Sequence, residues 1–396
     1  MGKVASSADF YQPSPIISPH SISTNLHEKH LAFADFIARH GRSYASKTEL
    51  ETRFEIFASN YDAMQAHNEQ FMAGNTLYQR GINKFADLTK EEFDNRYHTA
   101  LLGLDRHLKA NRPKVSSGHR LKNRFWDWLN PWQNREETDA DEEDANPMTN
   151  PDQQNEPQII RHAAGDIVNW YTAGKVSESV DQGGCGGCWA FVTATTLESL
   201  NAIENDLDVI PTYSVQYLMD CDTVNWGCDG GWMFDAYEQT AEHGVISWDD
   251  YPSSYLGYKQ RRCHDPGDGV DRFFNTFQQE EDFVNNDRIK EVVDKQPIGV
   301  AMYSNFDCLN AYQSGILMES DCTCSDPSLE VNHAVTIVGY GTSNSRKCKE
   351  YWIIKNSWGS DWGESGHFKM CADRKGKTRE YGTCQVNSYI MWPTLE

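Results

Sequence analysis

The segment at residues 181–191, Asp-Gln-Gly-Gly-Cys-Gly-Gly-Cys-Trp-Ala-Phe, constrains the fold of this chain more than any other. Four of the five residues from 183 to 187 are glycine, which leaves the backbone free to adopt unusual dihedral angles. Apolar residues then recur every three or four positions from Ala190 to Ile203, a spacing that predicts a helix. Cys188 therefore stands at a helix N-terminus, where free backbone N–H groups and the helix dipole favour an anion. A thiol at such a place is expected to have a depressed pKa and to act as a nucleophile.

Other chemistry is conceivable for the pair Cys185 and Cys188. A thioredoxin-like redox pair would have Trp before its first Cys and a βαβ setting, whereas here Trp follows the second Cys. A zinc knuckle would need a second close pair, and Cys221 and Cys228 are seven residues apart. Two cysteines that serve only as disulfide partners would leave Gln182 and the glycines unexplained. A nucleophilic Cys188 is the interpretation that uses the whole segment.

A nucleophilic cysteine needs a base and a group that orients the base. His333 opens an apolar β run that reaches Gly341, and a second run from Tyr351 ends at Asn356. Most of the 13 histidines are expected to be surface or core residues. His333 differs because two strands follow it and the second delivers an Asn close to Trp358.

The region from residue 30 to residue 97 has a helical pattern. Its most regular feature is a set of residues spaced four, four, three, four and four apart, which places them on one helix face: Glu49, Arg53, Phe57, Asn60, Met64 and Asn68. Glu49 and Arg53 are expected to form an ion pair, and Phe57 and Met64 to be buried. A second polar and aromatic group follows at Gly81, Asn83, Phe85 and Asp87, and either Asp87 or Thr89 is expected to cap a further short helix. Spacing alone would favour an ordinary helical bundle, and it is the polar positions that point elsewhere.

Together these motifs resemble the precursors of papain-family cysteine proteases of the cathepsin L-like type. The six spaced residues resemble the ERFNIN signature of the inhibitory prodomain, with Met64 where the family has Ile, and the group at residues 81–87 resembles its GNFD motif. The resemblance implies an α+β fold of two subdomains, a helical left domain and a β-barrel-like right domain. An α-helical prodomain precedes them in the chain and is expected to run backwards through the cleft. Gly187 departs from the usual Ser or Ala, and Asn169 from the usual Asp.

The resemblance also implies a role for each residue of the site. Cys188 would attack the scissile carbonyl as a thiolate, and His333 would protonate the leaving amine. Asn356 would orient the imidazole, and Trp358 would shield that contact from water. Gln182 and the Cys188 N–H would form the oxyanion hole. Asn356 follows Cys188 by 168 residues, which is longer than usual and is explained by an enlarged loop at 342–350.

Charge separates the chain into parts. The net charge of −22 divides into +4 over residues 1–135, nine acids without a base over 136–156, and −17 over 161–396. We expect an N-terminal extension at 1–29, an inhibitory prodomain at 30–100, a basic and then acidic linker with the processing site at 101–160, and a papain-like peptidase domain at 161–396. Processing is expected between residues 139 and 164 at acid pH, because protonation of carboxylates weakens the attraction between the parts.

The net charge and the distribution of apolar residues also limit the binding partners expected for this chain. Such an acidic chain is not expected to bind nucleic acid, and no apolar run reaches the 18 residues that a membrane span needs. We expect peptide substrates, the chain's own prodomain as inhibitor, no cofactor, no metal and a monomer. No signal peptide is visible, yet the cysteine content suits an acidic lysosome-like or vacuole-like compartment or secretion. The Trp-rich stretch at 125–132 has no assigned chemistry.

Eleven cysteines leave ten for disulfides once Cys188 is set aside. The resemblance implies three pairs by family position, and two more follow from a hairpin and from what remains: Cys185–Cys228, Cys221–Cys263, Cys322–Cys384, Cys348–Cys371 and Cys308–Cys324. Ten cysteines allow many other connectivities, and the sequence does not choose among them.

Substrate preference in the resembled family depends on the S2 pocket. Alignment on the motifs gives these substrate-binding positions: Gly230, Gly231, Trp232, Met233, Ala301, Val331, Asn332 and Tyr389. None is acidic, so an apolar P2 residue is expected, with Val or Leu preferred over Phe because Trp232 and Tyr389 are bulky. No His-rich insertion resembles the occluding loop of cathepsin B, which favours an endopeptidase. The alternatives are a non-catalytic protease inhibitor or binding protein, and a peptide ligase or acyl transferase that uses the same thioacyl intermediate.

Overall fold

The computed structural model describes residues 19–97, 168–252, 254–260, 262–264, 269–281, 284–304, 306–326, 328–372 and 380–395. The first range is the part of the expected prodomain that is described and is called the prodomain below; the ranges from 168 onward are called the C-terminal domain. Most of the expected extension and the whole linker at 101–160, with its Trp-rich stretch and processing site, lie outside the described residues. Among the described helices, none combines the length and the apolar character that crossing a bilayer requires.

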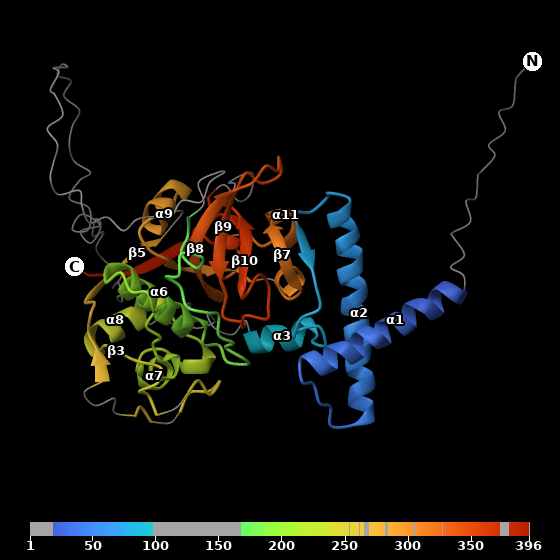
Figure 1. The fold of residues 1–396 in the computed structure, drawn as a ribbon, viewed down its shortest axis with the longest axis horizontal. Helices are drawn as coiled ribbons and strands as arrows, with labels where there is room; N and C mark the ends of the chain where they lie inside the picture. The colour runs from blue at the N-terminus through green and yellow to red at the C-terminus, as the bar shows by residue number, and fades with distance from the viewer. Residues whose placement is uncertain are drawn as a thin grey trace, which may run out of the picture.

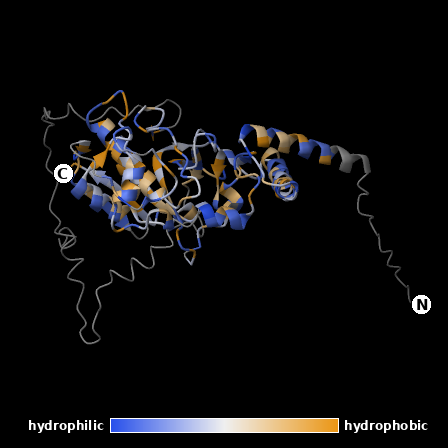
Figure 2. Ribbon diagram, turned by 90° about the horizontal axis from the view of Figure 1, so that it is seen from below, coloured by the Kyte–Doolittle hydropathy of each residue, from blue (hydrophilic) through white to orange (hydrophobic). Residues whose placement is uncertain are grey.

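The prodomain consists of three helices and one short strand: α1 (Pro19–Arg39), α2 (Lys47–Met72), β1 (Tyr78–Arg80) and α3 (Lys90–Tyr97). Ser46 caps the N-terminus of α2: its Oγ accepts from Glu49 N–H at 3.1 Å, and a Glu49 carboxylate oxygen accepts from Ala45 N–H at 2.7 Å. Phe57 and Met64 are buried on one face of α2, as predicted. Helix α1 projects away from the rest of the molecule and mixes hydrophobic and hydrophilic residues along its length (Figure 2).

The predicted ion pair between Glu49 and Arg53 is wrong. Arg53 instead forms two hydrogen bonds of 2.7 Å with the Glu92 carboxylate on α3, a bidentate geometry that a local partner does not offer. The polar residues of the predicted helix face hold the chain that follows it: Asn60 donates to the Ala86 and Leu88 carbonyls, and Asn68 exchanges two hydrogen bonds with the Arg80 backbone. Thr89 caps α3, as expected, since its hydroxyl accepts from Glu92 N–H at 3.2 Å.

The C-terminal domain has a helical part and a sheet part, as the resemblance implied (Figure 1). The helical part contains α6 (Cys188–Glu204), α7 (Val215–Cys221), η1 (Gly227–Asp229), α8 (Met233–His243) and the small sheet β3 (Val245–Ile246) and β4 (Val270–Asp271). The sheet part contains β2 (Val168–Asn169), β5 (Thr276–Glu281), α9 (Asn286–Val293), β6 (Ile298–Met302), α10 (Phe306–Leu309), β7 (Tyr312–Leu317), α11 (Glu319–Cys322), β8 (His333–Thr342), β9 (Glu350–Lys355), β10 (His367–Cys371), η4 (Thr383–Gln385) and β11 (Tyr389–Thr394). Helix α6 is buried along almost its whole length between the two parts.

One large sheet connects the prodomain to the C-terminal domain. Its strand order is β1-β7-β10-β9-β8-β6-β11-β5, with β2 beside β8. Strand β1 of the prodomain therefore forms an edge, antiparallel to β7 (Figure 1). The loop at 343–349 joins β8 to β9, at the place where the sequence predicted an enlarged loop.

The five described disulfides partly match the prediction. Three expected pairs are present, Cys185–Cys228, Cys221–Cys263 and Cys348–Cys371. The predicted pairs Cys322–Cys384 and Cys308–Cys324 are wrong, because the structure joins Cys308 to Cys322 and Cys324 to Cys384. The sulfurs of Cys322, Cys324 and Cys384 lie within 4.8 Å of one another, and Thr323 has a left-handed backbone that turns the two neighbours toward different partners. Sequence spacing could not reveal that turn.

Candidate active site

Cys188 is the first residue of α6, as predicted, and is the described cysteine that forms no disulfide. The chain enters the helix through Gly183, whose positive φ of 59° favours glycine. Gly187 precedes the helix, and a Cβ there would lie 3.0 Å from the sulfur of Met219. The Cys188 sulfur accepts a hydrogen bond from Ala334 N–H at 3.2 Å, which brings α6 against the start of β8. This contact joins residues 146 positions apart and could not be predicted from local spacing.

His333 and Asn356 meet across adjacent strands. His333 opens β8, Asn356 directly follows β9, and both side chains are buried. His333 Nε2 lies 2.8 Å from Asn356 Oδ1, which also accepts from Ser357 N–H at 2.9 Å. Because an amide oxygen only accepts, Nε2 is the ring nitrogen that donates to it. The Trp358 ring stacks on the imidazole with 5.2 Å between centroids, so it covers this contact.

Gln182 is buried next to these residues and is fixed at both ends of its amide. Its Nε2 donates to the Cys185 carbonyl at 2.9 Å, and its Oε1 accepts from the Ser357 hydroxyl at 2.5 Å. Ser357 thus connects Gln182 with its own neighbour Asn356, whose Oδ1 accepts from the Ser357 N–H. Sequence reasoning missed Ser357, although its place between Asn356 and Trp358 was a possible signal.

Lys355 is a second residue that sequence reasoning missed. It ends β9 next to Asn356, and its buried ammonium donates to Ser177 at 2.9 Å and to Thr195 of α6 at 3.0 Å. Burial lowers the pKa of Lys355 to about 8, against the attraction of the buried Glu198 on α6. The contacts tie the strand that positions Asn356 to the helix that begins with Cys188.

The expected depressed pKa of Cys188 is wrong for this state of the protein. Complete burial raises the pKa of the Cys188 thiol to about 12, although the N–H groups of Ala334, Trp189 and Cys188 act in the opposite direction. The free-energy cost of removing a thiolate from water exceeds the stabilisation that these N–H donors provide. Burial thus opposes formation of the Cys188 thiolate in the structure described here.

The prodomain packs on Trp358, beside the site, through an aromatic cluster. The rings of Phe85, Phe93 and Tyr97 contact the Trp358 ring at centroid distances of 5.4, 5.3 and 6.1 Å. Beside them, Lys84 forms a 2.5 Å ion pair with Asp181, the neighbour of Gln182. Of the predicted motif residues, Phe85 thus reaches the site, while Phe93 and Tyr97 were not singled out by the sequence.

The predicted S2 residues gather in one place. Trp232, Met233, Ala301 and Val331 are buried in the hydrophobic cluster that contains Cys188, and Tyr389 packs against that cluster. The Trp232 and Tyr389 rings meet edge to face at 5.3 Å. Two predicted members have structural contacts: the Asn332 side chain is bound to the backbone of Ser304 at 2.6 and 3.1 Å, and Gly231 leaves room for the side chain of Asn225. Gly230, whose φ is 116°, precedes Gly231 in the turn.

One group of ligand-type side chains within the described residues lies close enough to hold a metal, namely Cys322, Cys324 and Cys384. All three are engaged in disulfides, so their sulfurs are not thiolates. We assign no metal there.

Comparisons with known proteins agree with this geometry. Residues 164–394 match the family model described as papain family cysteine protease, and residues 33–93 match the cathepsin propeptide inhibitor domain (I29). The chain is 30% identical over 366 residues to a cathepsin L-like proteinase of Phaedon cochleariae, covering 92% of this chain and 93% of that protein. It is 32% identical over 362 residues to cysteine proteinase RD21A of Arabidopsis thaliana, covering 89% of this chain but only 64% of that relative's own length.

Solved precursor structures are also similar. Digestive procathepsin L 3 of the Tenebrio molitor larval midgut superposes with a TM-score of 0.67 at 27% identity, covering 93% of this chain and 99% of that one. The recombinant stem bromelain precursor gives 0.67 at 28% identity with the same coverage. Both are similar over the prodomain and the C-terminal domain alike. The chain belongs to the papain family of cysteine proteases, as a cathepsin L-like precursor with its propeptide inhibitor domain.

Proposed function

We propose that this proenzyme yields an endopeptidase in which Cys188, His333, Asn356 and Gln182 are the catalytic residues. The observation that carries the proposal is the 2.8 Å contact between His333 Nε2 and Asn356 Oδ1 under the Trp358 ring. Because Nε2 donates its hydrogen to Asn356 in this contact, Nδ1 is the nitrogen that exchanges a proton with the Cys188 sulfur. Sulfur and imidazole then form an ion pair before attack, and His333 returns its proton to the leaving amine.

Gln182 and the Cys188 N–H are proposed as the oxyanion hole. An amide nitrogen has two hydrogens, and the Cys185 carbonyl uses one of those on Gln182 Nε2. The second is available to the oxyanion that forms when the thiolate attacks. Donors held in place before reaction contribute about 3–4 kcal/mol of transition-state stabilisation in comparable enzymes.

Latency is proposed to follow from the packing of the prodomain on Trp358 and Asp181 beside the site. Burial of the Cys188 thiol, which raises its pKa, disfavours the ion pair with His333 in this state. Release of the prodomain uncovers Trp358 and admits water and substrate to the site. We propose release at acid pH with cleavage between residues 139 and 164, a domain division at 30–100, 101–160 and 161–396, and activity in an acidic compartment or outside the cell.

An apolar P2 preference is proposed from the cluster of Trp232, Met233, Ala301, Val331 and Tyr389. All five are apolar or aromatic, and the Trp232–Tyr389 contact limits the depth of the pocket. Peptides with P2 Val or Leu are expected to be cleaved faster than peptides with P2 Phe, and P2 Arg is expected to be poor. The variant Tyr389→Ala is expected to raise the cleavage rate of peptides with P2 Phe relative to peptides with P2 Val. A preference for P2 Arg would show that the pocket is assigned wrongly.

The experiment for the function is acid incubation of the full chain followed by a thiol-directed epoxide and an internally quenched peptide. The uncleaved parent chain is expected to be labelled slowly, and fast labelling of Cys188 together with internal peptide cleavage is expected only after loss of the N-terminal part of about 160 residues. His333→Ala should abolish cleavage, whereas His243→Ala, at an exposed position on α8, should keep it. An acid-treated chain with an intact label site but no cleavage would favour the inhibitor alternative. Product with an added amine in place of water would favour the ligase.

A further inference from the structure

The prodomain rests on a face of the C-terminal domain that we call the docking face, formed by residues 307–311, strand β7 and Lys347. Residues 307–311 offer three carbonyl oxygens to the prodomain: that of Asp307 accepts from Arg80, that of Asn310 from the Asn83 amide at 2.7 Å, and that of Ala311 from Gly81 N–H at 2.8 Å. All three donors lie in or beside β1. The backbone positions of residues 307–311 therefore decide whether these bonds form.

Strand β7 continues the docking face. Tyr78 of β1 pairs with Gly315, and the Leu77 carbonyl accepts from Ile316 N–H at 2.9 Å. A Cβ on Gly315, whose φ is 97°, would lie 2.3 Å from the Leu77 oxygen, so the two backbones approach as closely as glycine permits.

Lys347 forms the far end of the docking face. Its ammonium donates to the Gly74 and Asn75 carbonyls, both at 2.7 Å, just beyond the C-terminus of α2. A cation at this place binds carbonyls of the turn that follows α2 and complements the negative end of the helix dipole. Lys347 belongs to the enlarged loop between β8 and β9.

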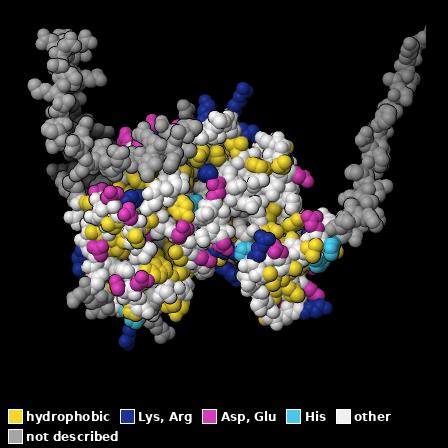
Figure 3. Space-filling view, viewed as in Figure 1, with side chains coloured by type: hydrophobic (Ala, Val, Ile, Leu, Met, Phe, Trp, Pro, Cys, Tyr) yellow, Lys and Arg dark blue, Asp and Glu magenta, His cyan; other side chains and the backbone are white. Residues whose placement is uncertain are grey.

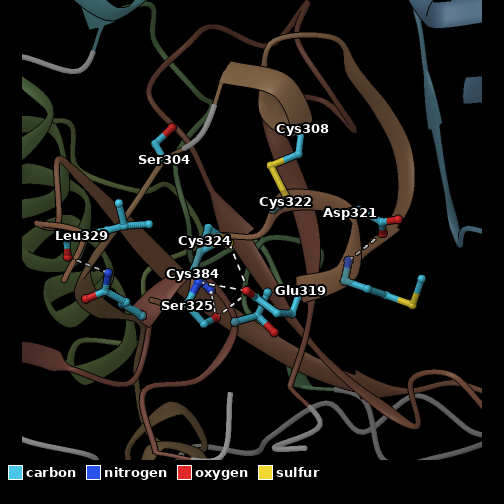
Figure 4. The surroundings of a disulfide bond; sticks show 12 residues. Ser304, Cys308, Glu319, Asp321, Cys322, Cys324, Ser325, Leu329 and Cys384 are labelled. Carbon is cyan, nitrogen blue, oxygen red and sulfur yellow. Dashed lines mark hydrogen bonds between the residues drawn. A yellow bond between two sulfur atoms is a disulfide. The ribbon is translucent and has the colours of Figure 1, made fainter. Parts of the chain in front are cut away.

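Two disulfides border these contacts. Cys308 lies next to Asp307 and is joined to Cys322 at the end of α11 (Figure 4). Cys348 lies next to Lys347 and is joined to Cys371 at the end of β10. Leu77 of the prodomain packs against the small cluster of Cys348, Cys371 and Met318.

We propose that Cys308–Cys322 and Cys348–Cys371 fix the docking face and thereby set how tightly the prodomain is held. Each bridge closes a loop, of 14 and 23 residues, which contains or directly borders the hydrogen-bonding groups of that face. A preformed face binds its partner without the cost of ordering a mobile loop. Opening either bridge releases that order, so docking weakens. Cys188 and His333 lie outside both loops. Asn356 lies within residues 348–371 but directly follows β9, which is paired with β8 and β10, so all three residues keep their places. The proposal rests on the proposed function only in its second readout, the labelling of Cys188.

The test uses the full-length proenzyme at neutral pH. The variants are C308S/C322S and C348S/C371S, and the matched control is C221S/C263S, a bridge of the helical part for which no contact with the described prodomain residues is found. The first readout is hydrogen exchange of the Gly81 amide, which bonds to Ala311. The second is the rate at which an epoxide labels Cys188 in the uncleaved chain.

Both docking-face variants are expected to show about tenfold faster exchange and labelling, and the control a change of less than twofold. After acid processing, the mature forms of all three variants are expected to cleave a peptide at rates within twofold of the parent. Equal effects of all three variants, or no effect of the two docking-face variants, would overturn the proposal. If C308S/C322S does not fold, C348S/C371S decides alone. Faster exchange at Gly81 with no labelling in any variant would support the bridges and refute Cys188 as the nucleophile.

Discussion

The ion pair between Glu92 and Arg53 gives a measurable prediction about acid release of the prodomain. Glu92 accepts two hydrogen bonds from Arg53 and one from Thr89 N–H, and it lies on α3 next to Phe93, which packs on Trp358. The Arg53 hydrogen bonds lower the pKa of Glu92 from 4.5 to about 2. The carboxylate therefore stabilises the packed prodomain fully above pH 4.5, and this stabilisation is lost as the pH falls from 4.5 toward 2.

The variant Glu92→Gln imitates the protonated state at every pH. Moving a pKa from 4.5 to about 2 corresponds to at most about 3 kcal/mol. The Glu92 side chain is 31% exposed, so screening by solvent reduces this to about 1–2 kcal/mol. If the epoxide reaches Cys188 only when the prodomain opens, labelling of the uncleaved chain at pH 7 should rise about 5- to 30-fold.

The matched control is Glu91→Gln, which removes the same charge from an exposed neighbour on α3. Labelling rates of the parent and both variants are compared between pH 7 and pH 3. The parent and E91Q are expected to accelerate below pH 4.5, whereas E92Q starts fast and accelerates less. Equal rates for E92Q and E91Q at pH 7 would refute the reasoning, since charge alone and not the Arg53 contact would then control release.

Three further predictions concern the mature enzyme and its fold. Asn356→Ala should lower kcat about 10- to 100-fold in a peptide-cleavage assay, because the imidazole loses the acceptor at 2.8 Å that orients it. Ser357→Ala should lower kcat about 5- to 10-fold with KM nearly unchanged, because Gln182 loses the 2.5 Å contact that fixes its amide; an effect on KM alone would contradict this. Lys355→Met should leave the buried Glu198 without its cation and lower the free energy of unfolding by about 3 kcal/mol, measured by denaturant titration; unchanged stability would show that Glu198 is neutral.

The parts of the site that could be predicted are those fixed by the chain's own periodicity. His333 and Asn356 were found because each stands at the end of a strand, and neighbouring strands bring such ends together. Cys188 was found because a glycine-rich segment leads directly into an apolar helix. These features depend on residues close in sequence, so the sequence alone displays them.

The errors share a different physical cause. Arg53 left the nearby Glu49 for a bidentate partner 39 residues away, and the disulfides of Cys322 and Cys324 depended on a left-handed turn at the residue between them. The pKa of Cys188 depended on burial, which the tertiary packing determines. Local spacing along the sequence does not determine long-range contacts or the exclusion of solvent, so these features could be seen only in the structure.

Release of the prodomain also changes which surfaces are available for association between two copies of the enzyme. When the prodomain leaves, β7 loses its neighbour β1, and the backbone N–H and C=O groups of Tyr312–Leu317 that paired with it become an open sheet edge. Such an edge is a template for pairing with another chain, and hence for aggregation. Acidic side chains are spread over the face shown in Figure 3 rather than gathered in one patch. We expect the excess of acidic residues over positions 161–396 to oppose such pairing at neutral pH, because like-charged copies repel one another.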